Sequence, residues 1–448
     1  MIRKVTRWTS AEVSSDREQW KKPAGAGVSW SAIAWIIALN LVIRGGWLLY
    51  MHPPQSSDFL WYFREAVSID QGHGYTFDGR PTAYWPVGYV YFLSLLFRTT
   101  GISLAAGLIA NAILSVGIVV LVYMVTLRVT ESRAVAAAAA IGYTLLPSQI
   151  AWNSILGSEE LFTFLLYLSL YVYLMATETS RLWGRLAVSA GLMGMACVVR
   201  PTVELFPFFL LAYEWWIQRL RFRQALLKVL VFTAIMFLTV SPVTIRNYTV
   251  MHHFVLVSTN GGVNLWQGTK VNDGYYWSKN PAINPLYKLE THEVLRDQVG
   301  KKLFEEYVVQ HPRLFVLNGF QKIFALYKDD RSVFYFFHNV NMPHWEGRLY
   351  VLAQRFSTSV YLLWMAVAVV GFLTMAFRRM KVRPSVMLLL TFVVYNTAVF
   401  FVFPAWDRFR YPMMPLFAVE FGLGVIWLGR LFGLFLPKRG ATGRKKLE

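Results

Sequence analysis

The chain has 448 residues, of which 56% are apolar, 16% aromatic and only 15% charged. A soluble domain carries a larger charged fraction, so this composition excludes an ordinary soluble protein and indicates an integral membrane protein. The net charge of +19 does not indicate a nucleic-acid partner, because the arginines and lysines gather in short segments between apolar runs and not in one basic stripe.

Apolar runs that can cross a bilayer follow one another along most of the chain. A helical crossing needs about 17–25 residues. Ten runs approach this length, and they lie near 28–50, 102–127, 134–151, 160–177, 186–203, 204–218, 226–243, 353–377, 385–403 and 412–435. The boundary within 186–218 is the weakest. We predict an all-α polytopic membrane protein with about ten transmembrane helices.

The basic residues predict the orientation of these helices. They fall in alternate loops, as expected of a cytoplasmic face. Both termini are therefore predicted to be cytoplasmic, with the protein in the inner (plasma) membrane and surrounded by membrane lipids. The predicted parts are a cytoplasmic tail 1–27, a catalytic transmembrane module 28–243, an extracytoplasmic loop region 244–352, C-terminal helices 353–435 and a basic cytoplasmic tail 436–448.

The segment 51–101 is predicted to be a single outer loop, although it contains the apolar run 84–97. As a helix, this run would cover only ~21 Å of a hydrocarbon core of about 30 Å. If it crossed, every later basic cluster would lie on the wrong face. We expect two juxtamembrane helices, Asp58–Asp70 and Tyr84–Arg98, on the membrane surface. Asp58 begins the first, either as a helix cap or as a catalytic base.

Two acids and four arginines lie at the predicted outer face. Glu159 and its neighbour Glu160 begin the fourth span, where an acid also stabilises the helix dipole. The arginines follow the fifth, seventh and ninth spans, and they are Arg200, Arg246, Arg408 and Arg410. They either extend toward lipid headgroups or bind an anionic ligand, which is the sharper explanation.

The long loop offers two further candidates for substrate binding. Asn260 lies in a polar, glycine-rich tract at 258–268, where turn chemistry alone would also explain the glycines. Lys322 lies near the end of an amphipathic helical stretch, 286–328, that returns toward the membrane. Its side chain is therefore placed to face the site.

Taken together, these motifs resemble those of GT-C glycosyltransferases, in the branch of protein-mannosyltransferase-like and lipid A aminoarabinose-transferase-like enzymes that use polyprenyl-phosphate sugars. The resemblance covers most of the chain. It rests on the order of these motifs: the acid in Ser-Ser-Asp-Phe at 56–59, Pro-Thr-Ala-Tyr-Trp-Pro at 81–86, Ser-Glu-Glu-Leu-Phe at 158–162, Arg-Pro-Thr at 200–202, Arg-Asn-Tyr at 246–248, the glycine-rich tract, and Arg-Phe-Arg-Tyr-Pro at 408–412.

The resemblance implies that Asp58 is the catalytic carboxylate and that the site opens on the extracytoplasmic side. It also implies a polyprenyl-phosphate-linked sugar donor and a lipid, glycan or protein acceptor. Glu159 matches the position where metal-dependent relatives place a second acid. A divalent cation, Mg or Mn, would then be held by Asp58 and Glu159, but this chain has a single acid where some relatives carry a pair, so the requirement stays open.

The chemistry expected of such a site is one displacement with inversion at the anomeric carbon. Asp58 would accept the proton of the acceptor hydroxyl, and fixed cations would stabilise the departing lipid phosphate. The alternative is a flippase or transporter of a lipid-linked sugar. We find no inverted repeat and no matched pair of broken spans, which are typical of transporters, so an enzyme is the leading hypothesis.

Overall fold

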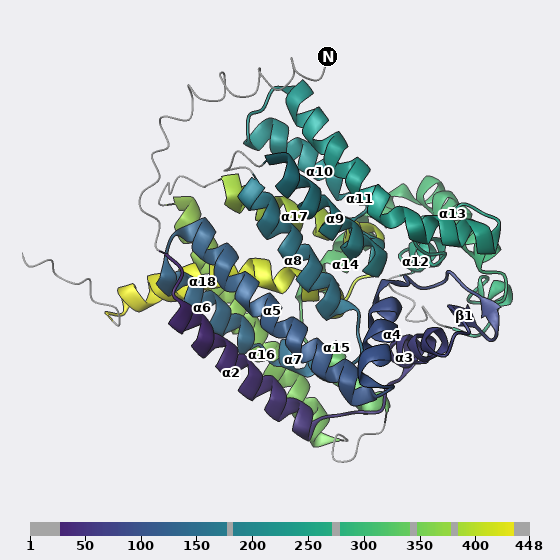
Figure 1. Ribbon diagram of the computed structural model, residues 1–448, viewed down its shortest axis with the longest axis horizontal. Coiled ribbons are helices and arrows are strands. Elements are labelled where there is room, and N and C mark those ends of the chain that lie inside the picture. Colours follow the sequence, from purple (N-terminus) through teal and green to yellow (C-terminus); the bar gives the residue numbers. More distant parts are fainter. Residues whose placement is uncertain (1–26, 177–181, 271–277, 341–346, 378–383, 434–448) are drawn as a thin grey trace, which may run out of the picture.

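The computed structural model describes residues 27–176, 182–270, 278–340, 347–377 and 384–433. Within these ranges eight helices are long and apolar enough to cross a membrane, which confirms the predicted all-α polytopic fold (Figure 1). They are α2 (Trp30–Tyr50), α5 (Leu104–Thr130), α8 (Glu159–Ala176), α9 (Leu182–Val199), α11 (Phe222–Met251), α16 (Arg348–Phe377), α17 (Pro384–Val402) and α18 (Met414–Leu431) with the 3₁₀ turn η6 (Asp407–Met413) before it. The predicted tails 1–27 and 436–448 lie outside the described residues, apart from Gly27.

Two of the ten predicted runs do not form a single long helix. The run 134–151 forms α6 (Arg133–Thr144) and α7 (Pro147–Ala151), and the chain bends by 61° between them. Proline disfavours helix in the residue before it, which accounts for the break. The run 204–218 forms only α10 (Phe206–Ala212) and the π-helical turn η4 (Tyr213–Ile217). It is shorter than a regular crossing because Pro201 ends α9 and Pro207 restarts the helix.

The segment 51–101, predicted to be an outer loop and called the outer loop below, contains two short helices, as predicted. Its elements are α3 (Ser57–Asp70), the antiparallel strands β1 (Thr76–Phe77) and β2 (Arg80–Pro81), and α4 (Gly88–Thr100). The second helix begins four positions after the predicted Tyr84, because Pro86 disfavours helix in the residue before it. The rings of Tyr62 and Tyr89 pack edge to face with centroids 5.4 Å apart, so α3 and α4 hold each other in place.

The described part of the long loop 244–352 contains several separate helices, and the predicted helical stretch 286–328 is divided among three of them. They are α12 (Gly261–Gln267), the 3₁₀ turn η5 (Tyr287–Leu289), α13 (Glu293–Gln310), α14 (Pro312–Tyr327) and α15 (Ser332–Asn339). A side chain at Gly262 would collide with the backbone carbonyl of Asp297 on α13. The Gly262 N–H instead donates to the Asp297 carboxylate at 2.6 Å. The glycine-rich tract therefore serves close packing of two helices.

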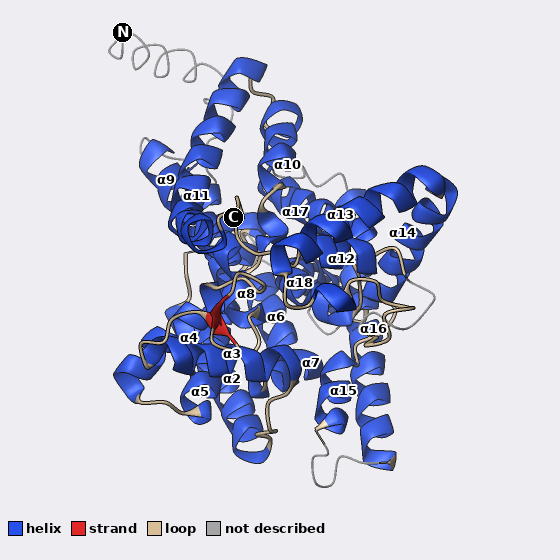
Figure 2. Cartoon of the chain, turned by 90° about the vertical axis from the view of Figure 1, so that its right-hand side faces the viewer, coloured by secondary structure: helices blue, strands red, loops and turns tan. Residues whose placement is uncertain are grey.

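The main apolar core joins the outer loop to the membrane helices. It runs from α4 through α5, α8, α9, α11 and α17, and includes Leu93, Leu121, Leu166, Met193, Phe232 and Phe392. In Figure 1, α3, α4 and β1 lie on the same side of the molecule as α12 and α13. Figure 2, turned by 90°, shows the small hairpin beside α3 and α4. The core thus fixes α3 against the polytopic bundle.

Candidate active site

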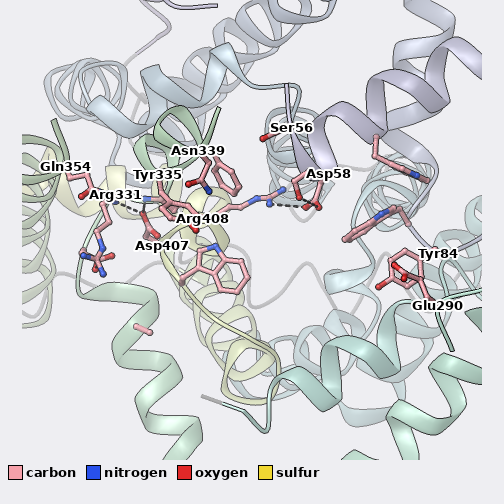
Figure 3. Close-up of a pocket in the computed structure, with 18 of the residues that line it drawn as sticks. Ser56, Asp58, Tyr84, Glu290, Arg331, Tyr335, Asn339, Gln354, Asp407 and Arg408 are labelled. Atoms are coloured by element: carbon pink, nitrogen blue, oxygen red, sulfur yellow. Dashed lines mark hydrogen bonds and ion pairs between the residues drawn. The ribbon is translucent and has the colours of Figure 1, made fainter. Parts of the chain in front are cut away.

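A cavity of about 1050 Å³ opens between the loop 51–101, the helices of the long loop 244–352 and the turn η6. Its walls come from α3, the segment before α4, the starts of α13 and α15, the end of α14 and the turn η6. Figure 3 shows Asp58 between two groups of side chains, with Tyr84 and Glu290 on one side and Tyr335, Asn339 and Arg331 on the other. This placement makes Asp58 the centre of the candidate site.

Asp58 lies in the first turn of α3 but does not cap it. Ser56 is the N-cap residue, and its side chain makes no capping hydrogen bond. The Asp58 carboxylate, 22% exposed, accepts a hydrogen bond from the Ser57 hydroxyl at 3.1 Å. Ser57 has a φ of +51°, a left-handed conformation that is unfavourable for a residue with a side chain and is frequent at functional sites. The backbone strain thus directly precedes the candidate base.

Arg408 links Asp58 to the membrane bundle. Its Nη1 lies 3.2 Å from Asp58 Oδ2, and its Nε donates to Glu159 Oε1 at 2.6 Å. The Arg408 side chain is only 7% exposed, and its guanidinium lies 4.7 Å from the ring centroid of Phe59 and 5.6 Å from that of Trp152. A buried cation needs anionic partners. The two carboxylates supply them, and the aromatic faces add cation–π attraction.

Arg200 completes a cluster of four charged side chains. Its Nη1 lies 2.6 Å from the same Glu159 oxygen that Arg408 contacts, and the Glu159 side chain is fully buried. Asp58 and Glu159 carry two negative charges, and Arg200 and Arg408 carry two positive charges. The cluster is therefore neutral, and it has no surplus positive charge for a substrate phosphate. The adjacent Glu160 takes another direction and accepts from Asn153 inside the bundle at 3.0 Å.

The predicted divalent cation would have to lie between Asp58 and Glu159. The guanidinium of Arg408 bridges these two carboxylates. In the part of the chain that the structure describes, no three or more His, Cys, Asp or Glu side chains gather to hold a metal ion. The donor set at this point does not fit a Mg or Mn ion shared by Asp58 and Glu159, because a fixed cation already bridges them.

Arg246 and Asn260 do not line the cavity. Arg246 donates to the backbone carbonyl of Thr82 and, at 2.8 Å, to that of Tyr75, and so it holds the chain on both sides of the hairpin. The side-chain oxygen of Asn260 accepts from the Ser258 hydroxyl at 2.9 Å. The structure places both residues behind the wall of the site rather than inside it.

Lys322 also lies outside the lining of the cavity. Its ammonium group donates to the backbone carbonyls of Gly268 at 2.9 Å and Val402 at 2.6 Å. Burial lowers the pKa of Lys322 to about 7. The side chain ties α14 to the chain after α12 and to the end of α17.

Arg410 points away from Arg408 and into the protein. It donates to the backbone carbonyls of Leu326 at 2.5 Å and Asp329 at 3.0 Å, and to the Asp330 carboxylate at 2.7 Å. Its side chain is 1% exposed. Arg410 therefore fixes the turn between α14 and α15 and does not face the cavity.

Asp407 holds the other end of that turn. One of its carboxylate oxygens accepts the backbone N–H groups of Arg331 at 2.6 Å and Ser332 at 2.7 Å, which satisfies free N–H groups at the start of α15. The turn η6 thus positions the segment 328–332 with Asp407 and Arg410, while Arg408, which lies between them in the sequence, reaches Asp58.

The turn between α14 and α15 carries two cations that were not among the predicted site residues. Lys328 and Arg331 both line the cavity. Arg331 pairs with Asp329 at 3.0 Å and remains 54% exposed, whereas Lys328 makes no side-chain ion pair within the described ranges. The available signal was the charge run Lys-Asp-Asp-Arg at 328–331, directly after an amphipathic stretch.

Comparison with known proteins supports the fold. No family model and no curated protein matches the sequence. The structure is similar to AglB, the oligosaccharyltransferase of Archaeoglobus fulgidus, solved in complex with an inhibitory peptide and a dolichol-phosphate. The two share 15% identity at a TM-score of 0.54, over 94% of this chain and 53% of that one. The same enzyme in complex with Zn and sulfate gives 16% identity and a TM-score of 0.53, over 90% of this chain and 50% of that one.

ArnT of Cupriavidus metallidurans, bound to undecaprenyl phosphate, is also similar, with 13% identity and a TM-score of 0.40, over 90% of this chain and 79% of that one. The chain spans about half the length of AglB. At such identities the AglB similarity concerns the fold alone. The chain is a multi-pass membrane protein that shares the GT-C fold of this archaeal glycosyltransferase.

Proposed function

We propose that this protein is a membrane glycosyltransferase that moves a sugar from a polyprenyl-phosphate donor to a hydroxyl acceptor on the extracytoplasmic face, with inversion. The observation that carries the proposal is the placement of Asp58 in a large cavity, where Arg408 anchors one carboxylate oxygen at 3.2 Å. The carboxylate remains 22% exposed toward the cavity. A base at this place can reach a bound substrate.

The donor phosphate is proposed to bind on the side of Asp58 where Lys328 and Arg331 lie. The four-residue cluster around Glu159 is neutral, so it leaves no cation for the phosphate. Lys328 makes no ion pair in the described part of the chain and supplies positive charge in the same cavity, and Arg331, although paired with Asp329, remains 54% exposed beside it. Such groups stabilise the departing phosphate more than the ground state. The archaeal enzyme of similar fold has been solved with dolichol-phosphate, which supports a donor of this class.

The reaction is one substitution at the anomeric carbon. The acceptor oxygen forms a bond to that carbon while its proton passes to a carboxylate oxygen of Asp58. The bond from the anomeric carbon to the phosphate oxygen breaks, and its electron pair leaves with the polyprenyl phosphate. Because attack and departure occur on opposite faces of the sugar ring, the configuration inverts. General-base catalysis of this kind contributes about 10²–10⁴-fold.

The test uses purified full-length protein in lipid nanodiscs with membranes from cells that lack it as the source of acceptor. A panel of polyprenyl-phosphate glucose, mannose, galactose, arabinose and aminoarabinose is added singly. We expect one donor to yield free polyprenyl phosphate and a glycosylated product. Transfer of an intact donor across proteoliposome membranes, with no cleavage of any donor, would contradict the proposal and favour a transporter.

A further inference from the structure

The cavity has a second wall, away from the place proposed for the donor phosphate. It lies on the other side of Asp58 from Arg331 and Tyr335, where Figure 3 shows Tyr84 and Glu290 together. Trp61 and Trp85 also line the cavity. Trp61 follows Asp58 by one helical turn on α3, and residues three apart share a helix face. The wall is thus within reach of the proposed base.

The aromatic rings of this wall are fixed by their own contacts. Trp85 lies 6.2 Å from Trp61 and 5.1 Å from Tyr84, centroid to centroid, with the rings tilted or edge to face. In such arrangements the rings hold each other in place without stacking face to face, so ring faces remain uncovered. Burial raises the pKa of Tyr84 to about 12, so its hydroxyl stays neutral. The wall presents rigid, neutral aromatic surface.

Polar groups of both signs border these rings. Arg296 lies with its guanidinium 5.3 Å from the ring centroid of Tyr84, and it is 7% exposed. Its Nε has no hydrogen-bond partner among the described residues. A buried donor without a partner is costly. Glu290 and Glu293 line the same cavity as Arg296, so the wall contains hydrogen-bond acceptors as well as this donor.

Glu293 also fixes the wall to α13. One of its carboxylate oxygens accepts the backbone N–H of Ala83 at 2.9 Å and the hydroxyl of Thr259 at 2.8 Å. The residue after Ala83 is Tyr84, so this contact sets the position of the aromatic cluster relative to Arg296. The wall is therefore built before any ligand binds.

We propose that this wall is the acceptor subsite and that the acceptor is a saccharide. A sugar ring offers one face of C–H groups that packs on aromatic rings, and an edge of hydroxyls that both donate and accept hydrogen bonds. Glu290 and Arg296 match the hydroxyls as acceptor and donor. A purely apolar lipid chain would leave these charges unpaired, and an ion of either sign would meet a like charge. This inference rests on the proposed function and names its acceptor class.

Binding can be measured without turnover. Saturation-transfer NMR on full-length protein in nanodiscs would use methyl α-mannoside, methyl β-glucoside, cellobiose and chitobiose as probes, with a tripeptide mixture as the comparator. We expect at least one saccharide to receive saturation and the peptides to receive none. Peptide signals without saccharide signals, or no signal from any saccharide, would overturn the proposal.

Variants assign the signal to the wall. Glu290→Gln, at an exposed position, and Trp61→Leu should each weaken saccharide binding roughly tenfold. Trp216→Leu, a change at a tryptophan that is 67% exposed and outside the cavity lining, should leave it unchanged. Stabilisation by polyprenyl phosphate, followed as a thermal shift, should persist in all three. Equal saccharide binding by the Glu290 variant and the parent would overturn the subsite. Absence of a thermal shift when polyprenyl phosphate is added to the parent would instead contradict the proposed donor class.

Discussion

Arg408 lies 3.2 Å from the carboxylate of Asp58, although 350 positions separate them in the chain. The same guanidinium contacts Glu159 at the start of α8. One side chain therefore connects the outer loop, a membrane helix and the turn η6. It orients the proposed base and joins the two carboxylates that the sequence suggested as metal ligands.

Replacing Arg408 by lysine tests this connection. A lysine keeps the charge but cannot hold two carboxylates in the fixed planar geometry of a guanidinium. We expect Arg408→Lys to lower the rate of transfer by at least about tenfold and Arg408→Ala to lower it further. Arg430→Lys, at an exposed position in the last turn of α18, is the control. Parent-like rates for both Arg408 variants in a nanodisc assay would remove this residue from the account.

In the outer loop, the length of the apolar run and the charge pattern were enough to predict the helices. The short run 84–97 and the alternation of basic loops led to the prediction of two short helices within 51–101, and the structure has α3 and α4 there. The motifs also pointed to Asp58, Glu159, Arg200 and Arg408, which the structure brings together. Local sequence sufficed here because charged side chains at the ends of apolar helices are unfavourable in the hydrocarbon core. Such acids and arginines therefore gather in one polar layer, where they pair with each other.

The parts that could not be predicted depend on direction and distant contacts. Arg408 and Arg410 lie two positions apart in a 3₁₀ helix, which has about three residues per turn. They therefore point in different directions, and spacing alone does not tell which one faces the cavity. Lys328 and Arg331 reach it only because Asp407 and Arg410 hold their turn. No pattern near 328 predicts those partners.

Lys328 is expected to contribute to donor binding. Because it lines the cavity without an ion pair in the described part of the chain, its charge is available to a phosphate. Lys328→Gln should weaken binding of polyprenyl phosphate about tenfold, measured by thermal shift over a lipid titration. Lys302→Gln, at a side chain that is 76% exposed, is the matched control. A Lys328 variant that binds like this control would place the phosphate elsewhere.

Transfer should not depend on a divalent cation. Arg408 already bridges Asp58 and Glu159, so no ion is needed to join them. We expect EDTA dialysis followed by assay, with and without added Mg or Mn, to change the rate by less than about twofold. A large loss restored by one of these ions would show that a metal takes the place we assign to the guanidinium.

Glu65 gives a pH dependence outside the site. Burial and, to a lesser degree, the nearby Asp78 raise the pKa of Glu65 to about 7, while a hydrogen bond from the Thr76 N–H opposes the shift. A carboxyl with a raised folded-state pKa stabilises the fold fully below its ordinary pKa, and this contribution is lost as pH rises through about 7.

Thermal unfolding of Glu65→Gln should therefore differ from the parent in a pH-dependent way. The parent should lose stability between pH 5 and pH 8 relative to the variant, by on the order of 1 kcal/mol once solvent screening is allowed for. Glu305→Gln, at an exposed position on α13, should track the parent throughout. A constant difference between the parent and Glu65→Gln would show that Glu65 does not titrate in this range.

The most direct test of the account is the rate of glycosyl transfer by Asp58→Asn. The variant keeps the size of the side chain, and Asp70→Asn in the same helix is the control because Asp70 does not line the cavity. Single-turnover release of polyprenyl phosphate from the accepted donor should fall at least about a hundredfold in Asp58→Asn, with binding of polyprenyl phosphate and the unfolding temperature unchanged. Release at the parent rate by a correctly folded Asp58→Asn protein would contradict the assignment of Asp58 as the base.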